Sequence, residues 1–142
     1  FQPAKELLTS MAKRTWVKLA KGAHALSFTS PDTQWHAVRI QAKRARYTAD
    51  AAATISGKAM RTYAGKLANV TDILGDLHDA HVAELFLREL AQSPNVSGRQ
   101  GLALGRLLDL QNQHNQIERR RFTKAWPPAR AAAQKAGLRK SG

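Results

Sequence analysis

One stretch decides how this chain folds: Trp35-His36-Ala37-Val38-Arg39-Ile40-Gln41-Ala42-Lys43-Arg44-Ala45-Arg46-Tyr47. At the period of an α-helix, its basic residues and its histidine gather on one side. The other side is small and apolar, so a neighbouring helix can approach it closely. That apolar side consists of Trp35, Val38, Ala42, Ala45, Ala49 and Ala52. The stretch therefore predicts an amphipathic helix with one packed face and one basic face.

The rest of the chain has the same helical period. Apolar residues recur at spacings of three and four, alanine is abundant, and long β-branched runs are missing. We expect helices over about residues 4–23, 32–54, 58–74, 77–92 and 99–126. Breaks are predicted at Ser56-Gly57, at Gly75, in the 93–98 loop and at Pro127-Pro128. The predicted fold is all-α: an antiparallel helical bundle over residues 1–126, followed by a basic tail over 127–142.

Apolar stripes on the other expected helices predict which residues face the core. The stripe of residues 4–23 is Leu8, Ala12, Trp16, Leu19 and Ala23. In 58–74 it is Ala59, Tyr63, Leu67, Val70 and Leu74, and in 77–92 it is Val82, Leu85, Phe86 and Leu90. Because the tryptophans are spaced with leucine and valine, we expect Trp16, Trp35 and Trp126 to be core residues.

Composition limits the classes of function. The 142 residues include 23 Lys plus Arg but only 10 Asp plus Glu, a formal net charge of +13 that favours a polyanionic partner. The absence of cysteine excludes a disulfide scaffold and fits a reducing compartment. No apolar run approaches the roughly 20 residues of a membrane span. Because Phe1 is not an initiator methionine, we expect an excised or trimmed chain, and no secretory signal is found at its start.

The basic face of the 35–47 stretch is the first candidate site. His36, Arg39, Lys43, Arg46 and Tyr47 fall within one arc, and Arg44 lies at its edge. Like charges three or four residues apart on a helix cost about 0.2–0.5 kcal/mol per pair, so a bound anion best explains this stripe. A second basic face, opposite the apolar stripe of residues 4–23, comprises Arg14, Lys18 and Lys21.

The segment His36-Ala37-Val38-Arg39-Ile40-Gln41-Ala42-Lys43-Arg44-Ala45-Arg46-Tyr47 resembles the signature helix of CHAD domains, the conserved-histidine α-helical domains. Downstream, Leu74-Gly75-Asp76-Leu77-His78-Asp79 resembles the family's Leu-Gly-x-x-x-Asp element. The resemblance covers about residues 4–126 and fits the second of the family's two four-helix halves, here followed by a long C-terminal helix. It implies a non-catalytic domain that binds inorganic polyphosphate. It also implies a CYTH-type triphosphatase as a fused or neighbouring partner, and a cytoplasmic location at polyphosphate granules.

The resemblance also implies roles for individual residues. The phosphate contacts would be His36, Arg39, Lys43, Arg44 and Arg46, with Arg14, Lys18 and Lys21 on the opposite wall and Arg119 and Arg120 from the last helix. Tyr47 and Asp79 would orient or pack, and no metal, cofactor or membrane is expected. Because only one half is present, either the chain is a fragment or two copies pair as a homodimer to replace the missing half.

Two other functions stay open. Arg119-Arg120-Arg121, Lys124 and the basic residues of 130–140 would suit sequence-independent nucleic-acid binding, although few aromatic residues lie among them to stack on bases. His36, His78-Asp79 and Asp109 follow the residue order of an HD-type metal phosphohydrolase. The cations that share the face of His36 would repel its metal ion, so we regard this second alternative as minor.

Overall fold

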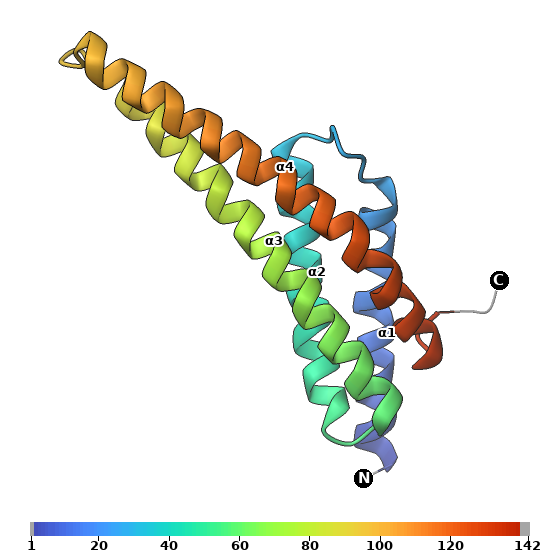
Figure 1. The fold of residues 1–142 in the computed structure, drawn as a ribbon. Coiled ribbons are helices and arrows are strands. Elements are labelled where there is room, and N and C mark those ends of the chain that lie inside the picture. Colours follow the sequence, from blue (N-terminus) through green and yellow to red (C-terminus); the bar gives the residue numbers. More distant parts are fainter. Residues whose placement is uncertain (1, 140–142) are drawn as a thin grey trace.

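The computed structural model describes residues 2–139. They form four helices (Figure 1): α1 (Gln2–Ala25), α2 (Asp32–Ala53), α3 (Lys58–Ala91) and α4 (Gly98–Lys135). No strand occurs among these residues, so the predicted all-α fold is confirmed, with four helices in place of the expected five. Phe1 and the last three residues of the predicted tail lie outside the described part of the chain.

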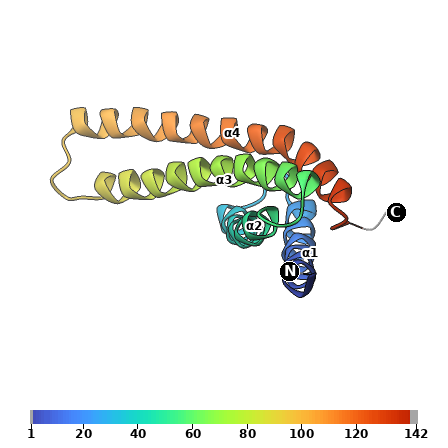
Figure 2. The ribbon, with the colours of Figure 1, turned by 90° about the horizontal axis from the view of Figure 1, so that it is seen from below.

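The helices form two layers, with α1 and α2 on one side of α3 and α4 (Figure 2). Consecutive helices run antiparallel (Figure 1). The α2–α3 connection turns at Gly57, whose φ of 83° is readily adopted only by glycine. Both α3 and α4 continue well past α2, so their far ends project from the rest of the molecule as a two-helix hairpin.

Aromatic rings join the two layers. Trp16 of α1 stacks on Trp126 of α4, with ring centroids 5.2 Å apart, and meets Tyr63 of α3 edge-on at 5.8 Å. Trp35 of α2 meets Phe122 of α4 edge-on at 5.2 Å. The predicted core role of the three tryptophans is therefore confirmed. So are the packed faces of α1 and α2, because every predicted residue of theirs is buried except the half-buried Leu8.

The single helix α3 replaces the two helices expected over 58–74 and 77–92, and the predicted break at Gly75 is wrong. An interior glycine costs a helix only about 0.5–1 kcal/mol relative to alanine. Its neighbours Ile73, Leu74 and Leu77 are all buried, and each such burial contributes roughly 1.5–3 kcal/mol. Packing on both sides of the glycine therefore outweighs the local preference.

The end predicted for the last helix is also wrong. Helix α4 continues through Pro127 and Pro128 to Lys135, so residues 127–135, expected in the tail, are helical. Over this part α4 bends toward α1 (Figure 2), as expected where two prolines remove backbone donors. The bend places Ala129 and Ala133 in the core, and this packing keeps the segment helical.

The inward face expected for residues 77–92 is wrong as well. Val82, Leu85, Phe86 and Leu90 are 50%, 53%, 59% and 41% exposed. These residues lie on the projecting hairpin, where neither α1 nor α2 reaches them. At the start of α3, Ala59 is exposed and Met60 is buried in its place.

Candidate functional site

Helix α2 presents its basic stripe at the surface. His36 and Arg44 are exposed, and Arg39 and Lys43 are half-buried. The residues on the opposite side of α2 are buried beneath α3 and α4. Packing of the small apolar side therefore fixes the direction in which the basic side faces.

Helix α1 adds its cations next to this stripe. The hydroxyls of Thr15 and Thr48 lie 2.7 Å apart and tie α1 to α2. A groove of about 180 Å³ lies beside this contact, and Arg14 and Lys18 line it. Lys21, one turn further along α1, is exposed. We call the resulting surface the outer α1–α2 face, defined by Arg14, Lys18, Lys21, His36, Lys43 and Arg44.

The cations of this face have no acidic neighbours in contact. Within residues 2–139, none of the six forms an ion pair, and neither does Arg39 at its edge. Positive charge without counter-charge on one surface attracts anions and repels itself. The structure places the α1 and α2 cations on neighbouring helices. That they bind an anion together stays a prediction.

A pair of histidines lies where this face meets α3. The rings of His36 and His78 stack with centroids 5.0 Å apart, and Arg39 lines the same small hollow. Burial lowers the pKa of His78 below its ordinary value, and the charges of Arg39 and His36 lower it further. The sequence pattern does not place His78 on the basic face, because only the tertiary contact between α2 and α3 brings it against His36.

Arg46 differs from the other cations of the stripe. Its Nη1 donates to Thr71 Oγ1 at 2.8 Å and to Asp72 Oδ1 at 3.3 Å, and its Nε lies 3.8 Å from Asp50 Oδ2. This guanidinium holds α2 against α3 and is partly neutralised. Tyr47, one residue on, is 62% exposed on the basic side of α2. Asp79 is exposed on α3.

Arg119 of α4 is buried, with its side chain only 10% exposed. Its Nη1 donates to the carbonyls of Phe28 at 2.8 Å and Ser30 at 2.6 Å, and its Nη2 to Asp32 Oδ1 at 2.7 Å. The guanidinium also lies 5.1 Å from the centre of the Trp35 ring. All of these partners hold the α1–α2 loop and the start of α2 onto α4, so the geometry gives Arg119 a structural role.

The other two arginines of the triplet also lie apart from the outer α1–α2 face. The guanidinium of Arg120 lies 5.7 Å from the ring centre of Phe28, in the loop between α1 and α2. Arg121 pairs with Glu118 at 2.9 Å and lies 3.7 Å from Asp76. These three arginines therefore do not extend the basic face that α1 and α2 form.

Comparison with protein families gave a match to the CHAD domain over residues 1–88. The matched part is more than half of the chain and includes α1, α2 and most of α3. The chain belongs to the CHAD domain family. Comparison with curated proteins and with solved structures gave no match.

This CHAD domain is all-helical, as the family is, and the family is known from polyphosphate-related proteins and is not itself catalytic. Both residue patterns that carry the resemblance lie inside the matched range, whereas α4 lies beyond it. Among residues 2–139, no helix has the length and hydropathy needed to span a bilayer.

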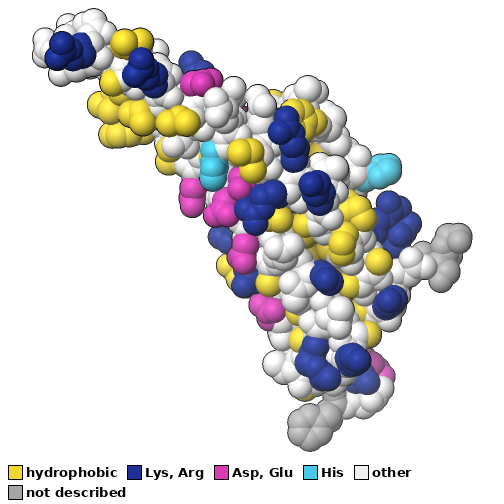
Figure 3. Space-filling view, in the orientation of Figure 1, with side chains coloured by type: hydrophobic (Ala, Val, Ile, Leu, Met, Phe, Trp, Pro, Cys, Tyr) yellow, Lys and Arg dark blue, Asp and Glu magenta, His cyan; other side chains and the backbone are white. Residues whose placement is uncertain are grey.

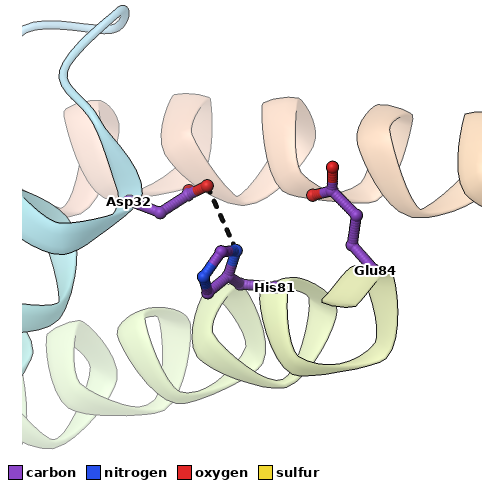
Figure 4. Close-up of side chains that lie close together, drawn as sticks. All are labelled: Asp32, His81 and Glu84. Carbon is purple, nitrogen blue, oxygen red and sulfur yellow. Dashed lines mark ion pairs between the residues drawn. The ribbon is translucent and has the colours of Figure 1, made fainter. Parts of the chain in front are cut away.

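One group in the domain has the donors of a metal site (Figure 4). Ligand atoms of Asp32, His81 and Glu84 all lie within 4.8 Å of one another, and Asp32 Oδ2 is 3.1 Å from His81 Nδ1. Each carboxylate already pairs with an arginine: Asp32 with Arg119 at 2.7 Å, and Glu84 with Arg88 at 2.9 Å. The ion pairs of this group therefore connect α2, α3 and α4 and give it a structural role.

The residues of the HD-type order do not assemble in this way. His36 and His78 are in contact, but the cation Arg39 lines the same hollow. The carboxylate there, Asp32, pairs with Arg119 and His81. Asp109 lies exposed on the projecting part of α4 and accepts a hydrogen bond from Gln113 at 3.0 Å. Within the described residues, these four side chains form no metal-ligating group.

Proposed function

We propose that this CHAD domain binds inorganic polyphosphate on the outer α1–α2 face and performs no chemistry on it. Membership of a family known from polyphosphate-related proteins supports the ligand. The single observation that carries the site is the group of cations on α1 and α2 that have no ion pair within the described residues. Anion binding alone accounts for these cations, so the proposal assigns none of them a catalytic role.

Binding is electrostatic in this proposal. The stripes of α1 and α2 run along neighbouring antiparallel helices, so a linear phosphate chain can contact one cation after another across the outer α1–α2 face. Arg14 and Lys18 of α1 line the groove beside Thr48 of α2. Each contact releases counterions from the polymer, which makes affinity fall steeply with salt. Arg39 and Arg44 offer forked donors to phosphate oxygens, and Lys43 offers a point charge.

His78, stacked on His36, adds a pH response to the face. Because the pKa of His78 is lowered, this ring is largely neutral at pH 7. Phosphate next to the ring favours the protonated form, so acidification and polyphosphate binding promote each other. Protonation of His78 therefore strengthens binding as the pH falls.

The cellular role that follows is an accessory one. A binding domain without catalysis can target a polypeptide to cytoplasmic polyphosphate granules, or deliver polymer to a CYTH-type triphosphatase domain. Both roles require selectivity for polyphosphate over nucleic acid. We attribute that selectivity to groove width, because a bare phosphate chain can enter a narrow groove that a duplex cannot.

Nucleic-acid binding is the second candidate, and the exposed Tyr47 favours it. An aromatic ring beside basic residues is a platform on which an unpaired base can stack. Competition between the two polymers distinguishes the candidates.

The decisive experiment is a titration with long-chain polyphosphate at near-physiological salt, with single-stranded and duplex DNA as competitors. We expect tight binding that excess DNA does not displace. Arg39→Ala with Lys43→Ala should weaken polyphosphate binding at least about tenfold and lower the slope of log Kd against log salt by about one to two. Helix content should be unchanged, since alanine is the better helix former.

The matched control removes the same charge from α4. Arg120→Ala with Lys124→Ala deletes two exposed cations outside the outer α1–α2 face and should leave affinity within about twofold. An equal loss from both double variants would mean that the domain responds to total charge and that the proposed face is not a site. Displacement by DNA, phosphate for phosphate, would favour the nucleic-acid candidate.

A further inference from the structure

The far end of the α3–α4 hairpin is apolar and uncovered. We call residues 81–114 the arm: none of them is buried. Its large exposed hydrophobic residues are Val82, Leu85, Phe86, Leu90, Leu102, Leu107 and Leu110, each between 41% and 61% exposed. A two-helix hairpin cannot cover this much apolar surface by itself, and a contiguous apolar patch of this kind marks an interaction site.

Five of these residues lie on one side of the arm. An open groove between the helices at the base of the arm is lined by Asp79 of α3 and Leu110 of α4, so these two side chains face the same way. Residues three or four positions apart lie on the same side of a helix, so Val82, Phe86 and Leu90 lie on the same side of α3 as Asp79. For the same reason, Leu107 lies on the same side of α4 as Leu110. We call this surface, Val82, Phe86, Leu90, Leu107 and Leu110, the arm face.

Charges at the two ends of the arm face have opposite signs. Asp76 and Asp79 lie at its base, next to the groove. Asp76 already lies 3.7 Å from Arg121, whereas Asp79 forms no ion pair within residues 2–139. Arg99 and Arg106 fall in the α4 row that includes Leu110, toward the tip. Figure 3 displays this order: Lys or Arg side chains at the tip, hydrophobic ones next, and Asp or Glu where the arm joins the rest of the molecule.

We propose that the arm face binds the arm face of a second copy of this chain, with the two arms antiparallel about a two-fold axis. In that arrangement the apolar residues of both copies bury one another as a four-helix bundle. The tip arginines of each copy lie beside the base carboxylates of the other. A surface with opposite charges at its two ends is complementary to itself in this orientation only.

The overall charge supports the same partner. The arm contains three arginines and three acidic residues, so its net charge is zero, whereas the whole chain carries +13. Two copies that meet at their arms therefore bury a part of the chain that carries no net charge, and their basic faces stay apart. The acidic residues are Glu84, Glu89 and Asp109, and the arginines are Arg88, Arg99 and Arg106.

Sedimentation velocity of the 142-residue chain tests the pairing. We expect a particle of twice the 15.6 kDa chain mass at micromolar concentration. Phe86→Asp should yield a folded monomer, because the side chain is 59% exposed and contributes little to the fold of one copy. The control Val17→Asp, on the equally exposed Val17 of α1 (55%), should remain a dimer. A wild-type chain that stays monomeric at high micromolar concentration would overturn the proposal.

Charge exchange tests the antiparallel orientation. Asp79→Arg and Arg99→Glu should each dissociate the homodimer, because each places like charges at both ends of the interface. Mixed together, the two variants should form a heterodimer, in which every tip–base pair is again opposite in sign. Failure of the mixture to associate, although the wild type dimerises, would rule out this orientation.

Cysteine cross-linking supplies an independent geometric readout, since the chain has no cysteine of its own. Ala103→Cys lies near mid-arm, close to the proposed two-fold axis, and should form a disulfide between copies. Asn95→Cys, in the loop at the tip, should not. Rapid cross-linking at Asn95→Cys instead would indicate a tip-to-tip contact and contradict the proposal.

Discussion

Arg39 and Arg119 have different surroundings, and these surroundings suit them to different roles. Arg39 forms no ion pair within residues 2–139 and faces a histidine pair at the edge of a basic surface. Arg119 donates to two carbonyls and a carboxylate. Its partner Asp32 is 87 positions away in the sequence, so no local pattern distinguishes Arg119 from the exposed Arg120 beside it. Arg39 was predictable because its helix has a clear apolar side.

Removal of the Arg119 side chain should destabilise the fold. Arg119→Ala leaves two loop carbonyls without their donor and removes the buried ion-pair partner of Asp32. We expect this loss to cost about 2–4 kcal/mol in the free energy of unfolding. Arg120→Ala should change it by less than about 0.5 kcal/mol, as is usual at exposed sites. Urea denaturation followed by circular dichroism measures both. A loss of polyphosphate affinity in Arg119→Ala without any loss of stability would assign this residue to the ligand instead.

At the scale of the element, the lengths of the helices were harder to predict than their faces. The packed sides of α1 and α2 follow from periodicity alone, because each of these helices has close neighbours on one side only. Helices α3 and α4 continue through Gly75 and through Pro127-Pro128, at which the sequence predicts a break and an end. Leu77 lies just beyond the first of these positions and Ala129 just beyond the second. Both are buried, and that burial depends on tertiary neighbours that a local pattern does not contain.

The interior glycine of α3 offers a direct test of this balance. A Cβ added at Gly75 meets nothing within 4 Å, so Gly75→Ala should stabilise the domain by about 0.5–1 kcal/mol. Gly22→Ala is the matched comparison, because its Cβ would lie 3.3 Å from Val38 Cγ2 and the contact should offset the gain. Thermal unfolding of both variants gives the difference. If Gly75→Ala destabilised the domain instead, α3 would require the backbone flexibility of glycine at this position.

At the scale of the whole molecule, the sequence predicts which residues are buried where the helices pack within one chain. It does not predict that the apolar face of the arm is exposed. Residues outside the arm, which we call the body, have their neighbours within the same chain, so an apolar stripe there is buried. The stripe that contains Phe86 is equally regular but lies on the arm, where the chain supplies no neighbour. Periodicity identifies an apolar face, but it does not say whether the partner of that face is the same chain or another one.

Hydrogen exchange should reveal this division between body and arm. In dilute solution, amides near Leu67 and Val70 should exchange only through global unfolding, because α3 is buried there on the core. Amides between Leu85 and Arg106 belong to the arm, where no side chain is buried, and should exchange much faster through local opening. Their protection should rise with protein concentration in the wild type and stay low in Phe86→Asp, since pairing covers the arm face. Equal protection of body and arm in dilute solution would show that the hairpin is stable alone, and the exposed leucines would then no longer require a partner.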